Sequence, residues 1–260
     1  MPKKSKKKRT LQKKRQKRYE EKHVAVVVGF AVVFAAFVIA SLLVVFQGGS
    51  GACAGLEKGR ERDLCFLDLA MNLSNPSVCG KLSSDQKEWA CLSDLARQRG
   101  EISLCDEISN EQFSAYCQVR LAVDSKDPSI CEGVSYNKAK DDCFKNLAEQ
   151  KNASSLCAKI EGKTRARECW ENVALQVGDA ELCTNIKGDA ARQDACTYAV
   201  ALENLDFGDC AGVFNESIRD TCYFQVGFRT LNLSVCDLIN GVNERAACRF
   251  TVKSWRGDDG

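Results

Sequence analysis

The sequence predicts an all-α protein: a single N-terminal transmembrane helix, followed by an α-solenoid of eight helical hairpins of about 26 residues, each stapled by a disulfide. Three observations predict this fold. The stretch 24–46 carries no charged residue. The 16 cysteines are separated by gaps that alternate between 12 and 14 residues, apart from a single gap of 13. Aliphatic residues recur three and four residues after these cysteines, which is the spacing of a helix face and not of a strand.

Residues 1–23 are expected to form a basic cytoplasmic tail. They hold 12 Lys and Arg against two Glu, a net charge of +10, whereas the rest of the chain holds 25 Lys and Arg against 33 Asp and Glu, a net charge of −8. An excess of Lys and Arg beside an apolar span stays on the cytoplasmic side. The segment 1–22 also suits anionic lipid headgroups, although fixing the topology is the simpler role. No nucleic acid partner is expected.

The uncharged stretch 24–46 has the length of a transmembrane helix. At about 1.5 Å per residue it spans the roughly 30 Å hydrocarbon core of a bilayer. A cleavable signal peptide would have the same polarity, but its apolar core usually has about 7–15 residues. We therefore expect an uncleaved anchor, a short linker at 47–51 and a single-pass cell-membrane protein whose C-terminal body is extracytoplasmic.

The segment 52–253 is predicted to be a repeat ectodomain, and 254–260 a polar tail. Each repeat has a first and a second cysteine, which we expect on two short helices. Three residues after the first cysteine stand Leu56, Leu82, Ile108, Val134, Ile160, Ile186, Val213 and Ile239. Four residues after the second cysteine stand Leu69, Leu95, Leu121, Leu147, Val173, Val200, Val226 and Val252. One residue further on, seven repeats have a small residue: Ala70, Ala96, Ala122, Ala148, Ala174, Ala201 and Gly227. A small side chain there lets a neighbouring helix approach closely.

The start of the first helix is marked in five repeats by Asn or Asp four residues before the first cysteine. These residues are Asn75, Asp127, Asp179, Asp206 and Asn232. Asn and Asp at this position accept hydrogen bonds from the free backbone N–H groups of a helix start. Pro76 and Pro128 follow two of them, at a helical position where proline is tolerated.

The cysteines are predicted to form disulfides and not metal sites. No C-x2-C pair occurs, and the chain has only one histidine, His23, so structural zinc sites are not indicated. An even number of regularly spaced cysteines is typical of an oxidising compartment. Pairing within repeats uses all 16 and gives Cys53–Cys65, Cys79–Cys91, Cys105–Cys117, Cys131–Cys143, Cys157–Cys169, Cys183–Cys196, Cys210–Cys222 and Cys236–Cys248. Pairing between repeats would make seven bridges; the invariant 14-residue gap favours this alternative.

No catalytic residue, metal site or cofactor is predicted. Outside the tail there is no histidine for a catalytic triad. An exported thiol–disulfide redox protein stays as a minor alternative, because redox enzymes usually show C-x-x-C. The leading hypothesis is a non-catalytic binding or scaffolding module for an unknown protein or glycan partner. The alternative is a structural spacer or envelope component without a specific ligand.

Two sets of residues are candidates for surface chemistry. Four sequons, at Asn72, Asn152, Asn215 and Asn232, are candidate glycosylation sites, although Asn is also common at turns and caps. The aromatic residues beside the second cysteines could line a binding face or fill the core; these are Phe66, Phe144, Trp170 and Tyr223. In architecture the pattern resembles secreted cysteine-rich Sel1-like repeat proteins, in which disulfides staple helix pairs. Both the period and the cysteine spacing differ here, so the resemblance implies no residue role and no activity.

Overall fold

The structure is a computed structural model that describes residues 51–257. All regular elements in this range are helices, in which eight long helices of 14 or 15 residues alternate with seven short ones of four to six residues. The long helices are α2 (Arg60–Leu73), α3 (Asp85–Arg99), α5 (Glu111–Ser125), α7 (Asn137–Lys151), α9 (Lys163–Val177), α10 (Ala190–Asn204), α11 (Glu216–Arg229) and α13 (Val242–Arg256). The short helices are η1 (Pro76–Lys81), α4 (Ser103–Asp106), α6 (Pro128–Glu132), α8 (Ser154–Cys157), η2 (Ala180–Asn185), η3 (Asp209–Gly212) and α12 (Leu233–Cys236).

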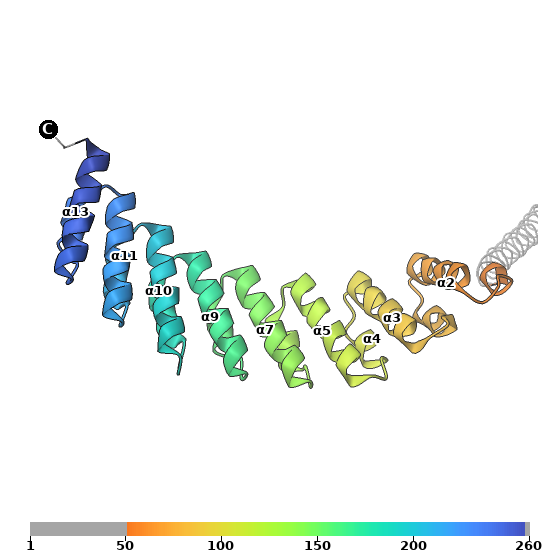
Figure 1. Cartoon of the computed structure of the whole chain (residues 1–260). Helices are drawn as coiled ribbons and strands as arrows, with labels where there is room; N and C mark the ends of the chain where they lie inside the picture. Colours follow the sequence, from red (N-terminus) through yellow and green to blue (C-terminus); the bar gives the residue numbers. More distant parts are fainter. Residues whose placement is uncertain (1–50, 258–260) are drawn as a thin grey trace, which may run out of the picture. The chain divides into compact units, whose positions relative to one another are not determined.

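The helices belong to two compact parts of the chain, one that ends at Glu88 and one that begins at Trp89. In the N-terminal part, α2 packs against η1. In the C-terminal part, the long helices α5, α7, α9, α10, α11 and α13 lie side by side in chain order (Figure 1). The short helices α6, α8, η2, η3 and α12 each contact the long helix before them and the long helix after them. The predicted all-α repeat is therefore confirmed.

Disulfides join the two cysteines of a repeat, as the spacing predicted. The structure shows Cys53–Cys65, Cys105–Cys117, Cys131–Cys143, Cys157–Cys169, Cys183–Cys196, Cys210–Cys222 and Cys236–Cys248. Cys79 and Cys91 are disulfide-bonded as well, so none of the cysteines is free. The repeat with the 13-residue gap still pairs internally, with a Cα–Cα distance of 5.8 Å. Eight disulfides in a helical repeat indicate an oxidising, extracytoplasmic environment.

The core lies between the long and the short helices of each repeat. The small residue five positions after the second cysteine is fully buried in all seven repeats that have one. The aliphatic residues predicted to face inward are also buried from Leu95 to Val252, whereas Leu56 is 39% exposed. Since a buried aliphatic side chain contributes roughly 1.5–3 kcal/mol, these positions hold the array together along with the disulfides.

Every long helix ends in the same left-handed turn. The residue nine positions after the second cysteine has a positive φ in all eight repeats: Ser74, Gly100, Lys126, Asn152, Gly178, Leu205, Leu231 and Gly257. The backbone N–H of the following residue then donates to the carbonyl of the small buried residue, as from Asp127 to Ala122 at 3.0 Å. This is a Schellman-type helix end. It turns the chain back so that the next short helix packs on the long one.

The five predicted caps of the short helices are confirmed. Each side-chain oxygen accepts the backbone N–H two residues further on, at 2.8 to 3.1 Å; the caps are Asn75, Asp127, Asp179, Asp206 and Asn232. The hydrogen bonds to Ser129 also lower the pKa of Asp127. The short helices are shorter, and the long helices longer, than the eight and twelve residues that the sequence suggests. A cap, one turn and a cysteine are enough, because the disulfide and the neighbouring long helices hold the short segment.

Within residues 51–257, no helix has both the length and the apolar character of a membrane span. The predicted anchor at 24–46 and the basic tail before it lie outside the described residues.

Candidate functional site

A buried carboxylate joins neighbouring repeats. Asp63, Asp141, Asp194 and Asp220 each stand two residues before a second cysteine, and all four are buried. Asp141 accepts the backbone N–H groups of Glu161 and Gly162 in the next repeat, both at 3.0 Å. Asp220 binds Asn240 and Gly241 in the same way, at 3.0 Å each. Because each pair of amides lies just before a long helix, the aspartate fixes where that helix begins.

The other two aspartates make variants of this contact. Asp194 accepts the N–H groups of Phe214 at 2.7 Å and of Asn215 at 3.0 Å. Asp63 binds both the backbone and the hydroxyl of Ser83, and Lys87 Nζ at 2.6 Å. The hydrogen bonds from Lys87 and Ser83 hold the pKa of Asp63 below its usual value. The sequence analysis did not assign these residues, although their fixed place before the cysteine was a usable signal.

Arg167 occupies the aspartate position in the fifth repeat, where it reverses the polarity of the contact. Its Nε donates to the carbonyl of Lys187 at 3.1 Å and its Nη2 to that of Gly188 at 3.2 Å. The loop it contacts contains the extra residue of the 13-residue gap, and Gly188 there has φ +70°. One added residue thus presents carbonyls where the other loops present amides. The single irregularity of the cysteine spacing and the arginine belong to one contact.

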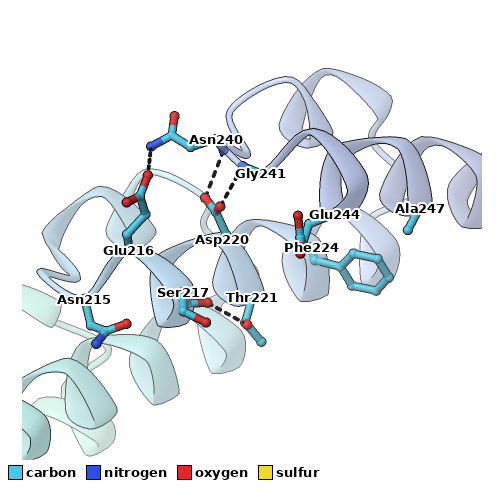
Figure 2. Close-up of a pocket in the computed structure, with 10 residues that line it drawn as sticks. All are labelled: Asn215, Glu216, Ser217, Asp220, Thr221, Phe224, Asn240, Gly241, Glu244 and Ala247. Atoms are coloured by element: carbon cyan, nitrogen blue, oxygen red, sulfur yellow. Dashed lines mark hydrogen bonds between the residues drawn. The ribbon is translucent and has the colours of Figure 1, made fainter.

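Beside Asp220 lies the largest groove found in the described residues, with a volume of about 840 Å³ (Figure 2). It runs between α11 and the start of α13 and is lined by Asn215, Glu216, Ser217, Asp220, Thr221, Phe224, Asn240, Gly241, Glu244 and Ala247. Figure 2 shows the Glu244 carboxylate beside the ring of Phe224. Asn240 Nδ2 donates to Glu216 Oε1 at 3.0 Å, which holds that carboxylate at the rim. The groove therefore combines acidic groups with one aromatic ring.

Two further grooves occupy the equivalent place in other repeats. The α9 groove, of about 470 Å³, is lined by Cys157, Ala158, Ile160, Glu161, Lys163, Ala166, Arg167, Trp170, Asn185, Lys187 and Gly188. The α2 groove, of about 270 Å³, is lined by Lys58, Gly59, Arg62, Asp63, Lys81, Leu82 and Ser83. Each lies between a long helix and the loop of the following repeat. The position is constant, but the charge differs: basic residues predominate in these two grooves and acidic residues in the groove beside Asp220.

The predicted aromatic binding face needs correction. Phe66 and Phe144 are 1% exposed and Tyr223 is 8% exposed, so these rings fill the core and do not form an open face. They stand directly after a buried cysteine on the same helix, and this places them at the seam between helices. Trp170 differs, because it is half-buried and lines the α9 groove.

The four sequons occupy different surroundings. Asn72 and Asn152 are exposed, on α2 and at the left-handed end of α7. The side chain of Asn72 donates to Asp68 at 3.0 Å. Asn215 and Asn232 accept backbone N–H groups as helix caps. No finding here tests whether any of the four carries a glycan.

Among residues 51–257, no three His, Cys, Asp or Glu side chains are grouped so that they could hold a metal ion. Comparison with known proteins finds no matching family model, no matching curated protein and no matching solved structure.

Proposed function

We propose that this protein is a non-catalytic binding module of the extracytoplasmic surface, anchored by the apolar stretch 24–46 and presenting the repeats to a partner. The eight disulfides support the location, because such bonds persist in oxidising compartments. The charge difference between the tail and the remaining chain supports the orientation.

The observation that carries the proposal is the contrast between a constant scaffold and variable grooves. Disulfides, left-handed helix ends and buried small residues recur in nearly every repeat. The groove between a long helix and the next loop changes from acidic beside Asp220 to basic beside Arg167. Helical solenoids commonly bind partners on such repeated surfaces. A pure spacer would not need different chemistry at equivalent positions.

The groove between α11 and α13 fits a basic partner segment. Glu216 and Glu244 offer carboxylates at its sides, while Asp220 is already engaged with the loop amides. The ring of Phe224 lies beside Glu244 and offers an apolar surface for the stem of a Lys or Arg side chain. Phe214 and Val242, which adjoin lining residues in the chain, are 69% and 77% exposed. A basic peptide with apolar residues would complement both properties.

The proposal is tested by titrating the full-length protein in neutral nanodiscs with a fluorescent Lys- and Arg-rich peptide and with an acidic peptide of equal length. Anisotropy should report binding of the basic peptide alone, weakened by salt. The double variant Glu216→Gln/Glu244→Gln should bind about tenfold less tightly. The matched control Glu181→Gln/Glu203→Gln removes two exposed carboxylates outside the groove and should bind as the wild type does. Equal binding by both double variants, or no binding by the wild type, would contradict the proposal.

A further inference from the structure

The α9 groove carries cationic groups that the fold does not use. Lys163, at the first position of α9, and Lys187, in the following loop, are exposed and line the groove. Neither ammonium group has an ion-pair partner within residues 51–257. Arg167 is engaged with the loop carbonyls and with Asp189. Glu161 is the one carboxylate among the lining residues. The groove therefore has positive charge available for a ligand.

Trp170 gives the same groove a flat apolar surface with a donor. Its half-buried ring packs against the buried clusters of two successive repeats, so its position is fixed. In the described part of the chain, its indole N–H has no hydrogen-bond partner. A rigid ring that keeps a free N–H donor is typical of binding surfaces. With the two lysines, the groove offers donors and an apolar face to an acceptor-rich ligand.

The two departures from the repeat meet in this groove. The extra residue places Lys187 and Gly188 in the lining, and Arg167 replaces the aspartate used by four other repeats. The helical array does not require either change, because the other repeats pack with 12 residues between their cysteines. Both changes instead add cationic residues to one place. This indicates that the groove serves a ligand and not only the packing of repeats.

We propose that the α9 groove binds an acidic oligosaccharide, with a sugar ring against Trp170 and its carboxylates at Lys163 and Lys187. This inference rests on the proposed binding function but concerns a different groove. Peptides usually bind as an added strand or as a helix in a long apolar groove. The described residues contain no strand edge, and this groove of about 470 Å³ holds one aromatic residue. A saccharide needs only the donors and the flat ring present here.

The test follows the three tryptophans, Trp89, Trp170 and Trp255, in full-length protein labelled with ¹⁵N-tryptophan in neutral nanodiscs. Trp170→Phe assigns the indole N–H signal of interest. Hexagalacturonate should shift the Trp170 signal and leave the other two in place. Its methyl ester, which has the same rings without charge, should bind at least about tenfold less tightly. Hexaglutamate, which has the charge without the rings, should shift the signal less than hexagalacturonate does. Because the basic tail contains no tryptophan, ions bound there do not affect the readout.

The variant Lys163→Gln/Lys187→Gln should lower the affinity for hexagalacturonate about tenfold. The control Lys138→Gln/Lys253→Gln, at exposed lysines outside the groove, should leave it unchanged. The proposal is overturned if the Trp170 signal does not shift, if the ester or the glutamate peptide binds equally well, or if both double variants behave alike. Basic-peptide binding at the groove between α11 and α13 is measured separately, so the two proposals can fail independently.

Discussion

Replacing Asp141 with alanine is expected to destabilise the junction between the fourth and fifth repeats by about 3 kcal/mol. The carboxylate accepts two backbone hydrogen bonds, from Glu161 and Gly162, both at 3.0 Å. Hydrogen bonds to a charged group contribute roughly 1.5–3 kcal/mol each. The lower value applies, because Glu161 is exposed and water can reach the amides once the carboxylate is gone. Asp141→Asn should cost about 2 kcal/mol, since its amide keeps only one acceptor.

Asp142 provides a matched control on the same helix. It pairs with Arg165 across the same junction, but the two side chains are 26% and 31% exposed. Half-exposed ion pairs contribute at most about 1 kcal/mol, so Asp142→Ala should cost less than that. Urea unfolding under non-reducing conditions gives both values, and hydrogen exchange at residues 161 and 162 locates the effect. If Asp141→Ala and Asp142→Ala lose the same stability, or exchange at 161 and 162 is unchanged, the buried contact does not have the role assigned to it.

Three further outcomes follow from the fold. Gly227→Ala should stabilise the protein by about 0.5–1 kcal/mol in urea unfolding, because glycine weakens a helix interior and the added Cβ would lie 3.4 Å from Val235 Cβ, an ordinary contact; a loss of stability would show that the seam is tighter there. Leu205→Gly should raise the unfolding midpoint, by up to about 1 kcal/mol, since Leu205 has φ 54°; an unchanged or lower midpoint would exclude strain at this residue. Thermal stability should fall as the pH drops below about 4, because the pKa values of Asp63, Asp127 and Glu168 are lowered in the folded state, mainly by hydrogen bonds from Lys87, Ser129 and Lys145 respectively. These carboxylates stabilise the fold above their unfolded pKa values and lose that effect as they are protonated; equal melting temperatures at pH 3 and pH 6 would contradict it.

The helix pairs could be predicted from sequence because their determinants are local. A cysteine with an aliphatic residue three or four positions on defines a helix face, and Asp127 with Pro128 marks a helix start without reference to the rest of the chain. The pairing of cysteines followed from their number and order. These features depend on neighbours within one repeat.

Features that depend on the next repeat could not be predicted in this way. Asp141 resembles a surface residue in its own helix, and its burial depends on two amides 20 and 21 residues away. Leu205 carries no sequence signal for a left-handed conformation, which the packing of the following short helix imposes. Phe144 could equally have been exposed until the neighbouring helices were placed. The grooves depend on the spacing between repeats, which composition alone does not define.

The short distance along the chain between bonded cysteines has a consequence for biosynthesis. During vectorial export, Cys131 and Cys143 emerge together, before Cys157, the next thiol, is available. Oxidation can then proceed repeat by repeat, with the correct partner the first one to appear. Refolding of the reduced, complete chain lacks this order. Loops of 12 and 14 residues differ little in closure entropy, so mispaired isomers are expected there and not on the nascent chain.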